Sequence, residues 1–279
     1  MIARQDGMAL AIVHNRNAAR NASLLPHVAE LADTLSRQGP VKQLEAWAQP
    51  DVQPHTVSVA LARDVLFARL QREWARYRLH DVPSRWRALR HVVKGARRAY
   101  LPIQEETRRA MRSMAIEAMV TDKHIRLWLQ FLDSDMQSLV VFEDDAVFGE
   151  RSIQEIVRLR ERLSQEPATR PVYIDLAGGC EPRELAVDRL LIGQDERFRH
   201  YRKPVTNTAC VYLVNRSTVQ LFVTQLLQRP WLRLISIDWL MNQLFILSRP
   251  DDDSMLCLHA DPPIFRHGST TGHYISWQT

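Results

Sequence analysis

Short apolar runs alternate with amphipathic stretches in the first part of this chain. Residues 9–13 form an apolar run of strand length, and apolar side chains recur at steps of three and four over residues 24–35, which predicts a helix. The Gln-Gly-Pro sequence at 38–40 ends that helix, and residues 41–47 are compatible with a second strand. A strand, a helix and a strand in this order indicate an α/β layer architecture.

The rest of the chain continues the alternation with longer helical stretches. Residues 56–132 have a largely helical pattern, interrupted before Pro83 and Pro102, because a proline displaces the residue before it from the α region. We expect the tail at 261–269 to be irregular. Further strands are expected within 139–142, 172–176 and 205–214, and further helices at 153–163, 219–226 and 239–247.

Composition places the chain among ordinary globular proteins. Its 279 residues, 46% hydrophobic and 25% charged, suffice for one large or two small domains. No apolar run approaches the about 18–20 residues of a membrane span, and the N-terminal sequence lacks the apolar core of a signal peptide, so we expect a cytoplasmic protein. Three widely spaced cysteines, Cys180, Cys210 and Cys257, argue against a disulfide framework and a structural zinc site.

The net charge of +5 is unevenly distributed. Residues 63–112 contain fourteen basic and five acidic residues, a net charge of +9, which leaves −4 for the rest of the chain. This basic block is either a solvated helix face or a contact surface for nucleic-acid phosphates or for anionic lipids and phosphorylated sugars. No nucleic-acid-binding motif accompanies the block, so a membrane surface or an anionic acceptor is the better candidate partner.

Three consecutive carboxylates, Glu143, Asp144 and Asp145, follow the apolar run at 139–142. Their mutual repulsion and desolvation are unfavourable unless a cation or solvent compensates them. Ligands of open α/β sheets bind at the carboxyl ends of strands, and Mg²⁺ or Mn²⁺ held there by hard oxygen ligands would neutralise a departing phosphate group. The alternative is an acidic turn before the helix at 153–163.

Taken in order, these segments resemble glycosyltransferase family 25, the bacterial lipopolysaccharide-type glycosyltransferases. The strongest element is 139–148, an apolar strand, Glu-Asp-Asp and an apolar continuation. A helix that carries His124 precedes it, and Lys123 replaces the serine that is usual before that histidine. The other matching segments are 173–178, 208–216, Asp238 and 261–269.

The resemblance implies a GT-A-like α/β fold, one domain over residues 1–279 with a central mixed sheet and an Arg-rich helical insertion at about 56–118. It also implies that a hexose moves with inversion from a nucleotide sugar, commonly UDP-linked, to a lipopolysaccharide-type or other saccharide acceptor. Mn²⁺ or Mg²⁺ would assist the transfer. The expected partners are the donor, a saccharide or glycolipid acceptor, and an anionic surface at the inner face of the cytoplasmic membrane.

The resemblance also assigns roles to individual residues. Asp145 and Asp144 face the metal or the donor ribose, and Glu143 supports the loop. Asp238 is the candidate general base for the acceptor hydroxyl, with a helix N-cap or first-turn acid as the alternative. The candidate contacts to the nucleotide sugar are His14, Asn15, Arg16, Asn207 and Thr208, of which the last two are alternatively turn residues.

Two other function classes stay open. A non-catalytic or nucleic-acid-binding protein would use the basic block at 63–112, and a metal-dependent phosphohydrolase would need more metal ligands than one acidic triplet supplies. His259, His267 and His273 are all candidate third metal ligands, and their spacing does not choose among them.

Overall fold

The computed structural model describes residues 7–14, 17–46, 93, 107–179, 190–202, 208–248 and 255–274. Its strands are β1 (Met8–Val13), β2 (Val41–Ala46), β3 (Ser138–Glu143), β4 (Ala146–Phe148), β5 (Val172–Asp175), β6 (Leu191–Gln194), β7 (Phe198–Tyr201), β8 (Val211–Asn215), β9 (Leu256–Ala260) and β10 (Phe265–His267). Its helices are α1 (Ala18–Ser36), α4 (Thr107–Leu132), α5 (Ser152–Leu163), α6 (Arg216–Gln228), the 3₁₀ helix η3 (Pro230–Leu234) and α7 (Ile237–Ser248).

A large mixed sheet forms the centre of the molecule, with the strand order β2-β1-β3-β8-β5-β9-β7-β6. Strand β1 runs parallel to β2 and β3, β8 runs antiparallel to β3 and β5, and β9 runs parallel to β5. Strands β4 and β10 form a separate antiparallel pair. The expected α/β fold with a central mixed sheet is therefore confirmed.

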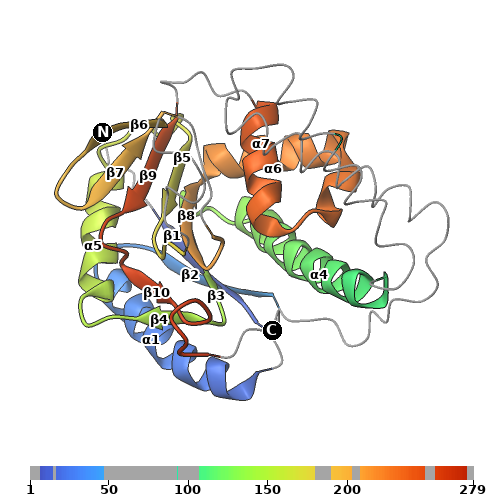
Figure 1. Ribbon diagram of the computed structural model, residues 1–279. Coiled ribbons are helices and arrows are strands. Elements are labelled where there is room, and N and C mark those ends of the chain that lie inside the picture. The colour runs from blue at the N-terminus through green and yellow to red at the C-terminus, as the bar shows by residue number, and fades with distance from the viewer. Residues whose placement is uncertain are drawn as a thin grey trace.

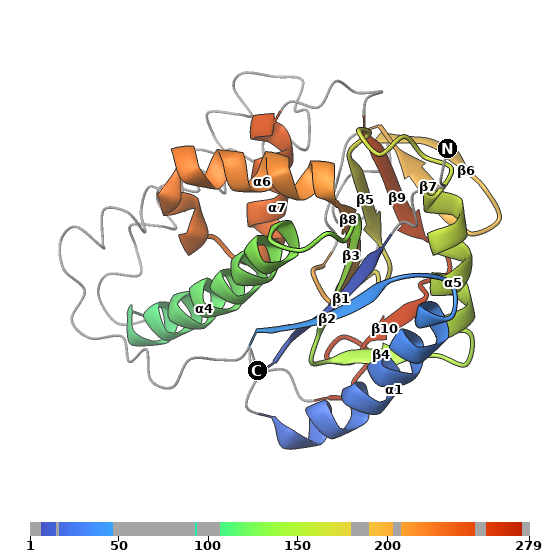
Figure 2. The ribbon, with the colours of Figure 1, turned by 180° about the vertical axis from the view of Figure 1, so that it is seen from behind.

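Helices cover both faces of this sheet. Figure 1 shows α1 and α5 on one face and α4, α6 and α7 on the other, and Figure 2 shows the same layers from behind. Leu10 and Ile12 of β1 pack in the layer of α1 and α5, whereas Ala9, Ala11 and Val13 pack in the layer of α4, α6 and α7. Because successive strand residues point to opposite faces, an entirely apolar strand such as β1 is buried on both sides.

Several elements differ from the sequence expectation. The tail at 261–269, expected to be irregular, contains β10, which pairs with β4 through contacts such as that of Phe265 with Phe148. Strands β6, β7 and β9 were also not predicted from the pattern. Strands β9 and β10 pair with segments far away in the chain, whereas β6 and β7 form a local hairpin whose first strand is exposed and lacks an alternating apolar pattern.

The Arg-rich insertion expected at about 56–118 lies outside the described residues, except for Val93 and the first half of α4. The basic block and the single-domain interpretation of residues 1–279 therefore stay predictions. Among the helices that the structure describes, none has the length and apolarity needed to cross a bilayer.

Candidate functional site

One edge of the central sheet collects polar residues from four strands. Strands β1, β3 and β5 all end at this edge and β8 begins there, because β8 lies antiparallel between β3 and β5. His14 follows β1, Glu143 ends β3, Asp175 ends β5 and Cys210 precedes β8. The carboxyl ends of strands are where open α/β sheets bind ligands, so this edge is the candidate site.

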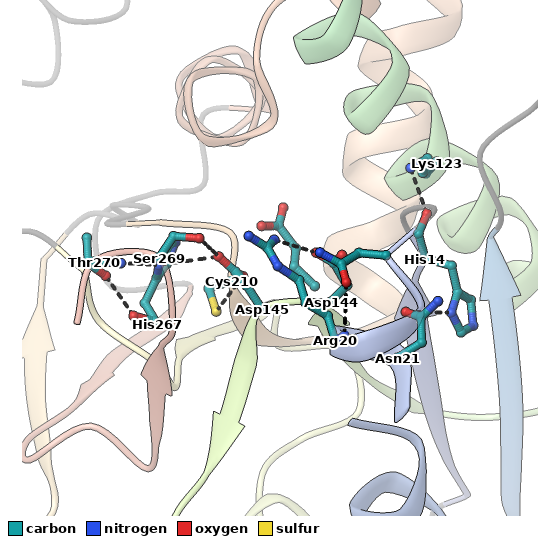
Figure 3. A network of polar contacts seen from close by, with 12 residues as sticks. His14, Arg20, Asn21, Lys123, Asp144, Asp145, Cys210, His267, Ser269 and Thr270 are labelled. Carbon is teal, nitrogen blue, oxygen red and sulfur yellow. Dashed lines mark hydrogen bonds and ion pairs between the residues drawn. The ribbon is translucent and has the colours of Figure 1, made fainter. Parts of the chain in front are cut away.

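Asp145 contacts the side chains of Cys210, His267 and Ser269. Its buried carboxylate accepts a hydrogen bond from Ser269 Oγ at 2.5 Å, and the Cys210 thiol lies 3.5 Å from Oδ1. His267 Nδ1 lies 3.6 Å from Oδ2 (Figure 3). Ligand atoms of Asp145, Cys210 and His267 all lie within 4.8 Å of one another, so these three side chains could hold a metal ion.

The structure distinguishes the three candidate histidine ligands. His267 is the one beside Asp145, because β10 pairs with β4 directly after the acidic triplet. The ring of His259 packs 4.5 Å from the ring of Tyr201, and the ring of His273 packs 4.7 Å from that of Tyr274. The strand pairing thus makes His267 the candidate ligand among the three histidines, a choice that the sequence spacing left open.

Cys210 is fully buried beside the acidic triplet. Burial raises the pKa of its thiol well above the usual value, and the carboxylates of Asp145 and Glu143 raise that pKa further. Without a cation, the thiol therefore keeps its proton and can donate it to Asp145 Oδ1.

The turn after β10 packs directly on Asp145. The Gly268 amide donates to the Asp145 carbonyl at 2.9 Å. A Cβ at position 268 would lie 2.7 Å from that carbonyl oxygen and 2.4 Å from Tyr274 Cδ2, so only glycine permits this approach without a shift of backbone. The turn thereby brings Ser269 and His267 to the carboxylate.

Asp144 contacts helix α1 instead of this cluster. Arg20 Nη1 lies 3.4 Å from Asp144 Oδ1, and the same guanidinium lies 5.0 Å from the centre of the Tyr274 ring. Within the described part of the chain, the donor atoms grouped around Asp145 do not include Asp144. Asp144 is the residue directly before Asp145 in the chain, and the positively charged guanidinium of Arg20 lies beside it.

A buried lysine approaches the triplet from α4. Lys123 Nζ donates to the His14 carbonyl at 2.7 Å, and the whole side chain is buried. Burial lowers the pKa of Lys123 to about 8, and the nearby carboxylates of Asp144 and Glu143 act in the opposite direction. Lys123 therefore places a positive charge behind the acidic residues at neutral pH.

Glu143 joins a buried polar chain. Its Oε1 lies 3.1 Å from His124 Nε2, and the other ring nitrogen of His124 lies 2.9 Å from the Tyr212 hydroxyl. Burial lowers the pKa of His124 to about 3, so its imidazole is neutral. Burial and the neighbouring Asp145 raise the pKa of Glu143 to about 8. The proposed supporting role of Glu143 is consistent with this arrangement.

His14, a candidate contact to the nucleotide, is buried within the fold. Its Nδ1 lies 3.5 Å from Asn21 Oδ1, and its Nε2 lies 3.5 Å from a carboxylate oxygen of Glu45. Burial lowers the pKa of His14. The ring therefore contacts α1 and β2, and its carbonyl faces Lys123.

The other candidate nucleotide contacts are divided between described and undescribed parts of the chain. Asn15, Arg16 and Asn207 lie outside the described residues. Thr208 donates its hydroxyl to the Gly178 carbonyl at 2.5 Å, a contact between positions 30 apart in the chain. Thr208 thus joins the loop after β5 to the segment that enters β8.

Asp238 reaches the same edge from the first turn of α7. Its half-buried carboxylate accepts a hydrogen bond from the amide of Ala209, the residue before Cys210. Burial raises the pKa of Asp238 to about 7, and the charges of Glu143 and Asp175 add to the increase. A carboxylate with a pKa near neutrality suits a general base.

Sequence reasoning did not identify Cys210, Tyr212 and Ser269 individually as members of the site. All three lie in segments that the sequence analysis singled out, 208–216 and 261–269, but their individual positions in the site were not predicted. Their contacts join residues 65 to 124 positions apart, for example Cys210 with Asp145 and Ser269 with Asp145. Such contacts carry no local signal.

Comparison with known proteins supplies no family for this chain. No family model matches its sequence, and no curated protein matches it. Its function is therefore inferred from the chemistry of the site.

Proposed function

We propose that this protein is a glycosyltransferase with a GT-A-like fold, which moves a hexose with inversion from a UDP-linked sugar to a lipopolysaccharide-type saccharide acceptor. One observation carries the proposal. Asp145 and His267, which together with Cys210 could hold a metal ion, lie at the same edge of the sheet as Asp238, a carboxylate of raised pKa. Sugar transfer requires a group that stabilises the departing diphosphate and a base for the acceptor, and this edge offers both.

Asp145 and His267 would hold the divalent cation on the donor side, expected to be Mn²⁺ or Mg²⁺. When bound, that cation would neutralise the charge that develops on the leaving diphosphate. Ser269 orients the Asp145 carboxylate by its hydrogen bond. Arg20 and Lys123 lie beside Asp144 and add positive potential where an anionic donor would bind. The imidazole of His267 favours Mn²⁺ over Mg²⁺, which prefers oxygen ligands.

Asp238 would act on the acceptor side. As the acceptor oxygen attacks the anomeric carbon, the carboxylate of Asp238 accepts the hydroxyl proton. The hydrogen bond from the Ala209 amide holds this carboxylate next to Cys210 and thus near the donor side. Its pKa of about 7 allows it to be ionised before attack and to bind a proton afterwards.

A glycolipid acceptor at the inner face of the cytoplasmic membrane is the second part of the proposal, and it rests on the basic block at 63–112. Sedimentation with vesicles should require anionic lipid and should weaken as salt rises, since exposed charges are screened beyond about 8–10 Å. Absence of vesicle binding at every salt concentration would contradict the proposed membrane contact of the basic block. A steep salt-dependent shift of DNA or RNA on a gel, without sugar turnover, would favour the nucleic-acid-binding alternative.

Thermal unfolding with UDP and Mn²⁺ tests the donor site. We expect the two ligands together to raise the melting temperature of the wild type and of Asp135→Asn, an exposed control, but not of Asp145→Asn. A screen of UDP-, GDP- and CMP-sugars for Mn²⁺-dependent hydrolysis then identifies the donor class. Equal stabilisation of wild type and Asp145→Asn, or no hydrolysis of any donor, would contradict the proposal.

A further inference from the structure

We infer that Cys210 is a ligand of the Asp145 centre, and that this centre binds cations of the zinc class more tightly than Mn²⁺ and Mn²⁺ more tightly than Mg²⁺. The inference rests on the proposed function only for the use of the cation in sugar transfer. The binding itself is carried by three described side chains: Asp145, Cys210 and His267.

The distances fit a tetrahedral ion. Bonds of about 2.0–2.3 Å from zinc to oxygen, nitrogen and sulfur place ligand atoms about 3.3–3.7 Å apart at the corners of a tetrahedron. Cys210 Sγ lies 3.5 Å from Asp145 Oδ1, and His267 Nδ1 lies 3.6 Å from Asp145 Oδ2. All three groups stay within 4.8 Å of one another, so a shared ion requires the carboxylate to rotate and the thiol and imidazole to approach each other by at most about 1 Å.

The chemistry of the donor atoms determines which ion the centre prefers. Mg²⁺ requires six oxygen ligands in near-octahedral geometry, and a thiol and an imidazole do not supply them. Zinc and cobalt accept carboxylate, imidazole and thiolate together, and divalent affinities rise from manganese to cobalt and zinc. Three protein ligands leave a fourth position open, as in catalytic zinc sites, and a phosphate oxygen of the donor would take it.

Hydrogen bonds from neighbouring groups orient two of the ligands, Asp145 and His267. Ser269 Oγ donates to Asp145 Oδ2, and the Thr270 amide donates to His267 Nδ1 at 3.2 Å. The second contact places the lone pair of His267 on Nδ1 and its proton on Nε2, so the nitrogen nearest Asp145 is the one that can bind a cation. A bound ion replaces the Thr270 amide on Nδ1 and displaces the thiol proton of Cys210 to solvent.

Cobalt is the probe, because a cobalt ion bound to a cysteine thiolate absorbs in the near ultraviolet. The full chain is stripped with a chelator and titrated with Co²⁺. We expect the thiolate-to-cobalt band in the wild type and in Cys257→Ser, a control at a buried cysteine of β9, and no band in Cys210→Ser. Zn²⁺ should remove the band at a concentration at least about 100-fold below that required of Mg²⁺.

Persistence of the band in Cys210→Ser, or equal displacement by Mg²⁺ and Zn²⁺, would overturn the inference. Chelator-treated Cys210→Ser is first checked for cooperative unfolding. If it does not fold, His267→Gln takes its place, because it keeps the thiol and should lose at least about tenfold in cobalt affinity. Unchanged affinity in that variant would equally overturn the inference.

The same preparations separate this inference from the proposed function. A cobalt band that depends on Cys210, in a protein that neither hydrolyses nor transfers a sugar nucleotide, would support the metal centre and contradict the proposed glycosyltransferase activity. Sugar transfer with Mn²⁺ in a protein that shows no cobalt band would support the glycosyltransferase activity and contradict Cys210 as a metal ligand.

Discussion

The Tyr212 hydroxyl lies 2.9 Å from Nδ1 of His124, in a chain of hydrogen bonds with one direction. The indole of Trp128 donates to Tyr212 Oη at 3.0 Å, and an indole N–H has no acceptor function. At the other end, Glu143 Oε1 lies 3.1 Å from His124 Nε2. The Tyr212 oxygen accepts from Trp128, so the buried hydroxyl proton needs His124 Nδ1 as its acceptor, and the neutral ring then carries its own proton on Nε2, toward Glu143. The chain as a whole fixes the position of the Glu143 carboxyl group.

Tyr212→Phe should destabilise the fold. The change leaves Trp128 Nε1 and His124 Nδ1 without their partner in a fully buried place, and we expect the free energy of unfolding to fall by about 2–3 kcal/mol. Urea unfolding at pH 7 measures it. Tyr274→Phe is the control: it keeps the ring that faces Arg20 and should change stability by less than about 0.5 kcal/mol. Equal effects of the two variants would show that the chain contributes nothing.

Arg216→Lys should also destabilise the protein. The guanidinium donates to four backbone carbonyls at and beyond the end of α4, and one ammonium cannot reach them all. We expect a loss of about 2–3 kcal/mol in urea unfolding. The accepting carbonyls are those of Phe131, Leu132, Ser134 and Met136.

The matched control for this change is Arg229→Lys. Within the described residues, the Arg229 guanidinium donates to two side-chain oxygens at the end of α6, those of Gln225 at 2.6 Å and Gln228 at 3.0 Å. A lysine there should alter stability by less than about 0.5 kcal/mol. An equal loss of unfolding free energy in Arg216→Lys and Arg229→Lys would show that the carbonyl contacts of Arg216 do not stabilise the fold.

Gly268→Ala should disturb the site specifically. The new methyl group would lie 2.7 Å from the Asp145 carbonyl oxygen, so the turn must move away from the acidic triplet. We expect a loss of about 1–3 kcal/mol in stability and weaker stabilisation by UDP with Mn²⁺ in thermal unfolding. Gly193→Ala is the control, because a Cβ at position 193 meets no atom within 4 Å. An unaltered ligand response in Gly268→Ala would count against the packing of this turn on Asp145.

Asp238→Asn should change how stability depends on pH. The folded pKa of about 7 exceeds the ordinary value of 3.8, so the folded state binds more protons between these limits. Stability of the wild type therefore falls as pH rises from 4 to 8, and the asparagine variant lacks this contribution. The half-buried carboxylate keeps some solvent contact, so we expect a difference on the order of 1–2 kcal/mol.

Urea unfolding at pH 4.5 and pH 8 measures this difference, with the exposed Asp133→Asn as control. Parallel pH profiles of wild type and Asp238→Asn would contradict the raised pKa.

If Asp238 is the general base, sugar transfer by the wild type should rise with pH to a plateau above pH 7. The asparagine variant should then be slower by about 10²–10⁴-fold.

The sequence alone predicted most of the elements on which the site is built, although not β10 and its pairing with β4. Strands β1, β2, β3, β5 and β8 and helices α1, α5, α6 and α7 correspond to segments whose apolar spacing shows a strand or a helix. The position of Glu143, Asp144 and Asp145 at the end of a buried strand was equally visible. These features are local, because a strand buried on both faces appears as a run of apolar residues, and a helix with one apolar face has apolar residues at steps of three and four.

Only the tertiary structure decided which side chains meet. Pairing of β10 with β4 selects His267 among three histidines, and the antiparallel entry of β8 brings Cys210 to Asp145. The pKa of Asp238 likewise depends on its burial against the charge of Glu143, far away in the chain. Contact between distant segments depends on how the whole core packs, and desolvation acts only after packing has excluded water, so neither is encoded in the spacing of neighbouring residues.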